Sequence, residues 1–284
     1  MKLTNVALIL LAHTIYSMAE FLHLIPHSHN DLGWLKTIEE YYEESVKHVF
    51  TTVIEALEEY SFHGHGHHHH HDRRWDPFRA KRKFVYADIG FLKYFLNDQP
   101  AERDVKIARL KNLIARGQFE FVNGGMSQAD SACTSYMDLA DNWFYGMRYL
   151  QKNLEVEPVS IWQIDPFGTS LSHMYIGALF GFEYALINRI TDTLKQEWAE
   201  SQRIQLTYRL PYNRKLKLHI ATTYSSPDGL VCDKACSYLF FDKSLLDSYL
   251  DPKKNTSNNT HSTCSEKTFI LVMPTTPLST STQS

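Results

Sequence analysis

The sequence predicts an α/β fold, with a mostly parallel β-sheet flanked by helices on both faces. Short apolar runs alternate with longer segments whose apolar residues recur at helical spacing over residues 21–188. The runs are apolar almost throughout, as expected for strands that a parallel sheet buries on both sides. With 284 residues, 43% of them apolar, the chain is long enough for one large or two small domains.

The predicted elements follow one another in β-α order. The first strand is an apolar run, and the long helix after it has apolar residues three and four apart, including Val49, Val53 and Ile54. The next helix ends where Gly117 can cap it. The last two helices each lie between apolar runs that end at polar residues. The expected strands are Phe21–Pro26, Lys83–Ile89, Gln118–Val122, Val159–Ile164 and Tyr184–Asn188, and the expected helices are Lys36–Tyr60, Glu102–Arg116, Tyr136–Leu154 and Leu171–Phe180.

The chain divides into a leader, a folded domain and a tail. Lys2 precedes a short apolar run and Ser17–Ala19 places small residues two apart, a pattern typical of a cleaved signal peptide at residues 1–19. Residues 20–250 form the predicted N-terminal α/β domain. Residues 251–284 are polar and are expected to be disordered, apart from an apolar strand at Phe269–Met273.

A histidine-rich insertion interrupts the domain at residues 61–82 and contains the run His67–His71. It is interpreted as a solvated low-complexity loop or as a translated intron, and loose binding of transition metals is the alternative.

Composition and covalent features indicate a secreted protein that does not bind nucleic acid. The 29 Lys and Arg against 32 Asp and Glu give a net charge of -3, which does not favour a polyanionic partner. No segment is long and apolar enough to span a membrane. Disulfides are permitted in the secretory pathway, with the pairing left open, and a zinc site at Cys232 and Cys236 is the alternative. Asn255 and Asn258 begin N-glycosylation acceptor sequences.

Polar residues follow the predicted strands, at the edge where parallel α/β sheets bind ligands. His29 and Asp31 follow the first strand, Asp165 the fourth and Arg189 the fifth. Residues two apart in extended backbone project to the same side, so His29 and Asp31 can hold one cation together, and their atoms suit Zn²⁺. The alternative for this pair is a hydrogen bond without metal.

Asp165 lies between an apolar strand and Pro166, whose fixed φ stiffens the turn that carries the carboxylate. A helix cap is the alternative role, but Ser170 lies closer to the next helix. Asp165 is therefore a candidate nucleophile, base or metal ligand. Trp34 and Phe167 stand near these carboxylates, where aromatic faces can hold sugar rings, and core packing is the alternative for Phe167.

Four ordered blocks carry a family resemblance. They are Ile25–Thr37 with Tyr41 and Tyr42, Arg82–Tyr86, Phe119–Gly125 and Trp162–Gly168. The segment Tyr224–Cys236 shows a weaker similarity to the same family. Together they resemble glycoside hydrolase family 38, and within it the lysosomal-type α-mannosidases. The resemblance implies a distorted barrel-like α/β fold of the glycoside hydrolase and deacetylase type.

The resemblance also implies a chemistry. It is that of a zinc-dependent retaining enzyme that cleaves terminal α-linked mannose from glycoprotein N-glycans. His29 and Asp31 match two zinc ligands. Asp165 matches the nucleophile, which also contacts the zinc, and Arg189 matches an arginine that orients it.

The sugar-contacting aromatics of the family are matched by Trp34 and Phe167. The implied partner is a mannose-containing oligosaccharide. The implied location is the secretory pathway, in the lysosome or outside the cell.

The chain departs from the family pattern at several positions. Thr169 stands where the family has His, and Met126 where it has Trp. Gln128 and Ala129 also differ from the family's acidic run, although Asp130 fits it. The family's acid/base Asp would follow Phe269–Met273, and the fourth zinc ligand belongs to a later domain. The resemblance therefore implies a truncated N-terminal portion that lacks the C-terminal domains of the parent enzyme and is inactive alone. The alternatives are a secreted pseudoenzyme that binds zinc or carbohydrate, and a metal-dependent deacetylase of related fold.

Overall fold

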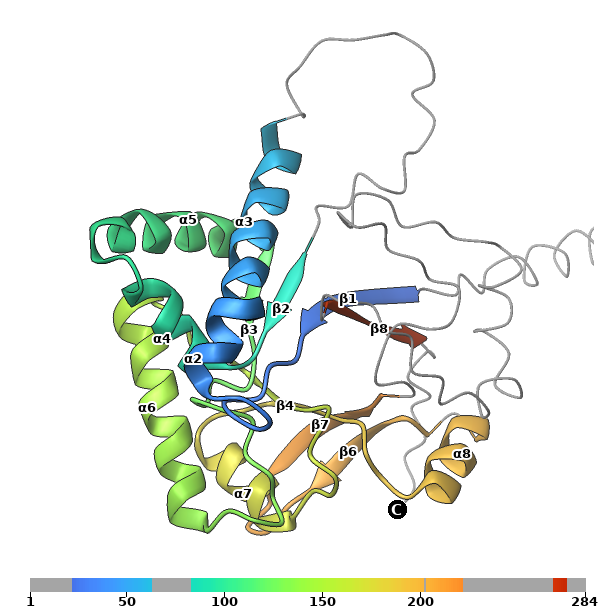
Figure 1. The fold of residues 1–284 in the computed structure, drawn as a ribbon. Coiled ribbons are helices and arrows are strands. Elements are labelled where there is room, and N and C mark those ends of the chain that lie inside the picture. The colour runs from blue at the N-terminus through green and yellow to red at the C-terminus, as the bar shows by residue number, and fades with distance from the viewer. Residues whose placement is uncertain (1–21, 63–82, 202, 222–267, 275–284) are drawn as a thin grey trace, which may run out of the picture.

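The computed structural model describes residues 22–62, 83–201, 203–221 and 268–274 (Figure 1). The predicted signal peptide, the histidine run, both glycosylation sequences and Cys232 with Cys236 lie outside these residues. Within the described residues, no helix has both the length and the apolar character needed to cross a bilayer.

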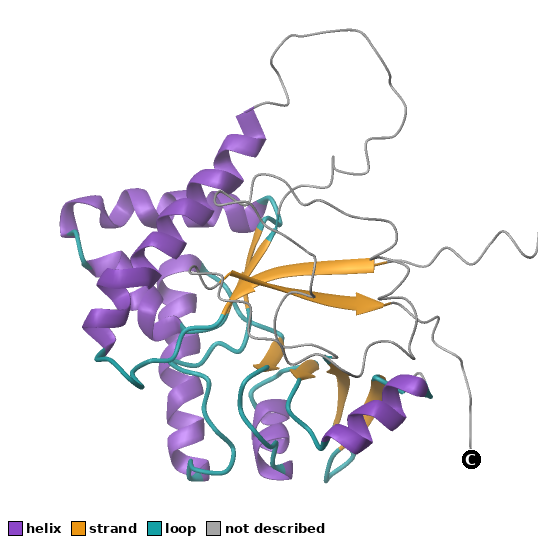
Figure 2. Cartoon of the chain, turned by 45° about the vertical axis from the view of Figure 1, so that its right-hand side comes forward, coloured by secondary structure: helices purple, strands orange, loops and turns teal. Residues whose placement is uncertain are grey.

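Two four-stranded sheets form the centre of the described structure (Figures 1 and 2). Their strand orders are β3-β2-β1-β8 and β4-β5-β7-β6. The strands are β1 (Leu22–Ser28), β2 (Phe84–Tyr86), β3 (Phe119–Phe121), β4 (Ser160–Gln163), β5 (Tyr184–Ile187), β6 (Gln205–Arg209), β7 (Lys215–Ile220) and β8 (Thr268–Pro274).

Most neighbouring strands are parallel. The pairs β1 with β2, β2 with β3, β4 with β5 and β5 with β7 run parallel, while β8 on β1 and β6 on β7 run antiparallel. The predicted α/β class with a mostly parallel arrangement is confirmed, although the strands are divided between two sheets.

The two sheets adjoin just after β3. The backbone N–H of Asn123 donates to the carbonyl of Ser160 at 2.7 Å, and its side-chain oxygen accepts from the N–H of Trp162 at 3.5 Å. Asn123 has φ of 61°, in the left-handed region that Asn tolerates better than most residues. Apolar side chains from both sheets fill the space between them, namely Val85, Ala87, Val122, Trp162, Ile164, Leu186 and Ala221. This arrangement agrees with the barrel-like fold that the resemblance implies.

Helices α3 to α6 lie to one side of the first sheet, and α7 packs on the second (Figure 1). The helices are α2 (Ile38–Tyr41), a π-helical turn (Tyr42–Val46), α3 (Lys47–Phe62), α4 (Ile89–Asn97), a 3₁₀ turn (Pro100–Glu102), α5 (Arg103–Ala115), α6 (Tyr136–Leu154), α7 (Leu171–Leu179) and α8 (Asp192–Glu200). Thr37 and Glu40 form a reciprocal capping box at the start of α2, which fixes where the loop after β1 ends.

Several boundaries differ from the sequence-based expectation. The expected strand Lys83–Ile89 ends at Tyr86, and α4 begins at Ile89. One continuous apolar run covers both elements, so periodicity does not separate them. Helices α4 and α8 and strands β6 and β7 were not expected. The apolar segment Phe269–Met273 does form a strand, β8, within the region expected to be a polar tail.

The larger apolar core lies between the first sheet and its helices. Phe50 of α3 stacks on Phe95 of α4 with ring centroids 4.7 Å apart, and both are almost fully buried. A buried ion pair lies at the edge of this core, where Lys106 of α5 contacts Asp98 and donates to the carbonyl of Phe95 at 2.9 Å. These contacts hold α4 and α5 together behind β2.

Candidate active site

The candidate residues come from three strand ends that face the same edge. His29 directly follows β1, Asp165 comes two residues after the end of β4, and Arg189 two residues after the end of β5. Parallel strands present their carboxyl ends at one edge of a sheet, and the contact between the two sheets brings the edges together. The fold therefore places side chains from distant parts of the sequence side by side.

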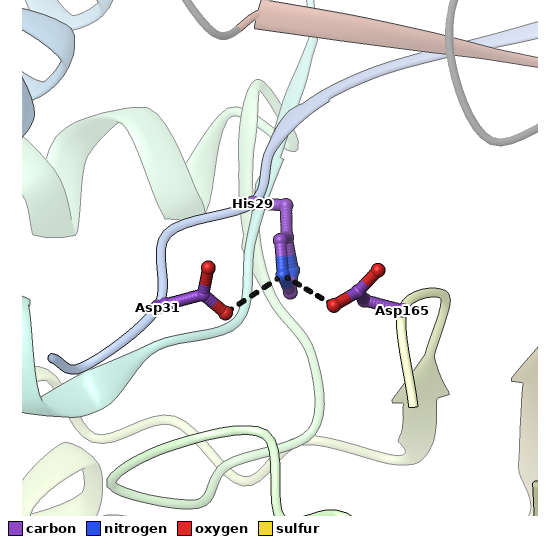
Figure 3. Close-up of side chains that lie close together, drawn as sticks. All are labelled: His29, Asp31 and Asp165. Atoms are coloured by element: carbon purple, nitrogen blue, oxygen red, sulfur yellow. Dashed lines mark ion pairs between the residues drawn. The ribbon is translucent and has the colours of Figure 1, made fainter. Parts of the chain in front are cut away.

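His29, Asp31 and Asp165 converge on one point (Figure 3). Nε2 of His29 lies 3.2 Å from Oδ1 of Asp31 and 3.5 Å from Oδ2 of Asp165. One ligand atom from each of the three residues lies within 4.8 Å of the other two. His29 is 7% exposed, while both carboxylates are partly exposed, so the cluster opens toward solvent on the carboxylate side.

Arg189 pairs with the other oxygen of Asp165. Its Nη2 donates to Oδ1 at 2.5 Å, and Oδ2 is the oxygen that faces His29. The hydrogen bond from His29 lowers the pKa of Asp165 most, burial opposes this, and Arg189 lowers it further, to about 2. Asp165 is therefore ionised at neutral pH.

Burial and the neighbouring carboxylates have opposite effects on the pKa of His29. Burial lowers it, but hydrogen bonds to Asp165 and Asp31 outweigh burial and raise it above the usual value. The proton held in this way is the one on Nε2, because Nε2 is the nitrogen that faces both carboxylates. A cation at this point would have to displace that proton.

The donor set of the cluster fits a divalent metal ion. One imidazole nitrogen and two carboxylate oxygens are ligands that Zn²⁺ takes, and a site with three protein ligands leaves a position open for substrate or water. Three atoms within 4.8 Å of one another can share one ion.

Two residues that sequence reasoning missed lie behind His29. Nδ1 of His29 lies 2.9 Å from Nε2 of Gln128, and the amide of Gln128 also hydrogen-bonds Asp88. Asp88 is 1% exposed and accepts from the N–H of Asn30 at 3.4 Å. Asp88 follows β2 as Asp165 follows β4, so the same strand-end rule finds it once β2 ends at Tyr86. Nothing in the sequence singles out Gln128 except its departure from the family pattern.

The loop that carries Gln128 is fixed by its neighbours. Asn142 of α6 holds Ser127 through both amide atoms, each at 3.0 Å. The N–H of Gly90 donates to the carbonyl of Met126 at 2.8 Å, and a Cβ on Gly90 would lie only 2.9 Å from that oxygen. The start of α4 therefore packs against this loop and keeps Asp88 beside Gln128.

Asn188, the residue before Arg189, is held by hydrogen bonds to Ile164 and Lys195. Asn188 donates through Nδ2 to the carbonyl of Ile164 at 3.1 Å, which ties the end of β5 to the residue before Asp165. Nζ of Lys195 donates to the side-chain and backbone oxygens of Asn188 at 2.7 and 2.9 Å. Burial lowers the pKa of Lys195 to about 8.

The two candidate aromatic residues are open to solvent. Trp34 is 73% exposed and Phe167 is 68% exposed. Neither is part of the apolar core, so core packing does not account for Phe167.

Strand β8 contains the apolar segment after which the family's acid/base Asp was expected. It runs antiparallel to β1, with Thr268 opposite Ser28 and Pro274 opposite Leu22. Its carboxyl end therefore lies at the far end of β1 from His29.

Comparison with known proteins identifies the family of the chain. Residues 21–273 match the sequence profile of the glycosyl hydrolases family 38 N-terminal domain. The chain belongs to glycosyl hydrolase family 38. It is 34% identical over 189 residues to alpha-mannosidase F of Dictyostelium discoideum and 31% identical over 222 residues to alpha-mannosidase 2 of Rattus norvegicus. Those stretches cover 66% and 74% of this chain but 17% of each relative.

A solved structure supports the fold. An alpha-mannosidase from Enterococcus faecalis superposes with a TM-score of 0.55 at 16% identity, over 81% of this chain and 23% of that one. The chain thus corresponds to less than a fifth of the length of the two curated relatives, and it matches them through the family's N-terminal domain.

Proposed function

We propose that this chain carries the nucleophile and three metal ligands of a zinc-assisted retaining α-mannosidase. The observation that carries the proposal is the convergence of Asp165 with His29, Asp31 and Arg189 at one sheet edge. Membership of family 38 and the α-mannosidase relatives favour this reading over a deacetylase. The substrate we infer is terminal α-linked mannose on glycoprotein N-glycans.

In the proposed reaction Asp165 acts as the nucleophile. Its ionised carboxylate attacks the anomeric carbon, the bond from that carbon to the glycosidic oxygen breaks, and a glycosyl ester forms on Asp165. Water then hydrolyses the ester and releases mannose. Arg189 holds Oδ1 of Asp165 and so limits rotation of the carboxylate during attack. A divalent cation on His29, Asp31 and Asp165 would supply Lewis-acid contacts to sugar hydroxyls. Trp34 and Phe167 would contact the sugar.

The departing oxygen needs a proton from a second carboxyl group, roughly 5 to 5.5 Å from the nucleophile in a retaining enzyme. We infer that this group comes from outside the described residues, because β8 ends away from the cluster. We also propose that the chain alone does not turn over an aryl α-mannoside, since the matched stretches cover only 17% of each α-mannosidase relative.

A mannosyl fluoride tests the nucleophile separately from the acid. Fluoride leaves without protonation, so an α-mannosyl fluoride slowed by a second ring fluorine should form a stable ester on the zinc-loaded chain. Peptide mass spectrometry should find the adduct on Asp165, with none on Asp165→Asn and none from the corresponding glucosyl fluoride. Absence of any adduct on the wild-type chain, or an adduct that persists in Asp165→Asn, would refute the proposed role.

We also propose that the protein enters the secretory pathway, on the signal-peptide pattern at residues 1–19 and the acceptor sequences at Asn255 and Asn258. Its destination there would be the lysosome or the cell exterior. Expression in a secreting cell should give a product that begins after Ala19 and shifts in mass with a glycosidase that removes N-glycans. A cytosolic product that still begins at Met1 would contradict this.

A further inference from the structure

The outer face of helix α6 carries large apolar side chains. The helix runs along the outer side of the described structure (Figure 1) and packs on the core through residues such as Trp143 and Leu150, both fully buried. The opposite face of such a surface helix is normally polar. Here Met137 is 61% exposed, Phe144 49% and Tyr145 61%. Apolar side chains that gather on an exposed face indicate a contact surface.

These apolar residues share one stripe with two opposite charges. Positions 137, 141, 144 and 148 are separated by four, three and four residues, so they lie on the same side of the helix. The stripe therefore runs Met137, Asp141, Phe144 and Arg148, and Tyr145 lies beside its centre. The rings of Phe144 and Tyr145 have centroids 5.6 Å apart, and Cζ of Arg148 lies 6.0 Å from the Phe144 ring. An aromatic centre thus lies between an acidic and a basic position.

The two charges of the stripe are not explained by contacts within the chain. Asp141 and Arg148 are exposed and form no ion pair with any residue that the structure describes. The helix dipole favours acidic residues in the first turn and basic residues in the last, and its effect fades beyond those turns. In α6 those turns hold Asp138 and Lys152, whereas the two stripe charges lie nearer the middle. The dipole therefore does not account for them.

The order of side chains along the stripe complements its own reverse. We consider a second α6 laid antiparallel on this face, with a two-fold axis between Phe144 and Tyr145. Asp141 and Arg148 are equally far from that axis, so each faces the other on the second copy, and the aromatic centres meet. A parallel arrangement would oppose Asp141 to Asp141 and Arg148 to Arg148, and like charges repel. The charge order therefore selects an antiparallel, two-fold pairing, in which both copies use the same patch.

We propose that the outer face of α6, from Met137 to Arg148, is a dimerisation surface on which a second copy of this chain packs its own α6 in antiparallel orientation. The partner is a second copy because the stripe is complementary to itself in both charge and apolar character. One helix from each copy buries an area at the low end for protein complexes, so the dimer is weak and forms at high protein concentration.

The first test is the oligomeric state of the full chain. Sedimentation equilibrium at concentrations up to about 1 mM should show a reversible monomer–dimer equilibrium. A chelator and a reducing agent prevent links between chains through metal on the histidine run or through the exposed Cys133. Phe144→Ala removes a central ring from both copies and should raise the dissociation constant at least about tenfold. A wild-type chain that stays monomeric over the whole range would overturn the inference.

Charge reversal tests which residues face one another. Asp141→Arg and Arg148→Asp each place like charges opposite one another, so each variant alone should be monomeric, with a circular dichroism spectrum like that of wild type. An equimolar mixture of the two restores opposite charges at both places and should dimerise as wild type does. Glu197→Arg, exposed on α8, makes the same charge change elsewhere and should leave the dissociation constant unchanged. Dimers that withstand both reversals, or a mixture that stays monomeric, would contradict the proposed pairing.

Disulfide formation tests the antiparallel orientation. In a Cys133→Ser background, the sulfurs of Phe144→Cys lie beside the axis and should join two copies under mild oxidation. Those of Met137→Cys lie about 22 Å apart at 1.5 Å per residue and should not join. A parallel dimer would link both variants equally. Peptide mass spectrometry identifies the bond, and a link at position 137, or none at position 144, would overturn the arrangement.

Discussion

The close packing of α6 on the loop after β3 gives a prediction whose size follows from the structure. A Cβ built on Gly146 would lie 2.2 Å from the carbonyl oxygen of Gly124, 2.7 Å from the carbonyl carbon of Gly125 and 2.9 Å from the nitrogen of Met126. All three are backbone atoms, which cannot swing aside as a side chain would. Gly146→Ala therefore has to move either the helix or the loop.

The expected cost combines two opposing terms. Overpacking of this kind costs about 1 to 3 kcal/mol, and three backbone contacts place Gly146 at the upper end. Replacing a glycine inside a helix by alanine returns roughly 1 kcal/mol. The net loss in free energy of unfolding should be about 2 kcal/mol, measured by urea denaturation followed by circular dichroism. Tyr145→Ala, which removes an exposed side chain next in the helix, is the control and should change stability by less than about 0.5 kcal/mol. A Gly146→Ala chain as stable as wild type would show that α6 does not pack closely against this loop. In that case α6 would not fix the position of Gln128.

Three further perturbations test other parts of the structure. Lys106→Met removes one partner of Asp98, which keeps Lys47 at 3.3 Å and the hydroxyl of Tyr42 at 2.7 Å, and should lower the free energy of unfolding by about 2 kcal/mol. A loss below about 0.5 kcal/mol in urea denaturation would show that the remaining partners and solvent compensate for Lys106. Burial lowers the pKa of His173 to about 4 in the folded chain. Between the ordinary pKa of histidine and pH 4, the unfolded chain therefore binds a proton on this residue and the folded chain does not. The stability from this residue is present above pH 6.5 and is lost as the pH falls toward 4, on the order of 3 kcal/mol in all. Between pH 7 and pH 4, His173→Phe should lose less stability than wild type, and equal losses would contradict the assignment. Lys195→Met removes the hydrogen bonds that hold Asn188, the residue before Arg189, and should slow ester formation from the mannosyl fluoride about tenfold. Lys195→Arg should restore part of the rate. Equal rates in Lys195→Met and wild type would show that Arg189 holds its place without it.

Strand ends could be predicted from the sequence, and they led to most of the site. Apolar runs that stop at polar residues placed His29, Asp165 and Arg189 at one edge, because parallel strands align their carboxyl ends. The same rule missed Asp88, since the run after β2 continues as apolar residues into α4 and hides where the strand stops.

Other features depend on tertiary contacts that no local pattern records. The contact between the two sheets depends on the hydrogen bonds of Asn123 to β4. Gln128 reaches His29 only because α4 and α6 hold its loop from both sides. The direction of β8 is set by its pairing with β1 and cannot be read from an apolar run that would suit either orientation.

We expect His29, Asp31 and Asp165 together to bind one divalent cation. The most direct test is zinc content after equilibrium dialysis of the full chain, of His29→Ala and of Asp165→Ala, each measured by elemental mass spectrometry. The wild-type chain should hold one zinc ion per chain more than either variant, whatever the histidine run binds in all three. Equal zinc content in all three chains would contradict it.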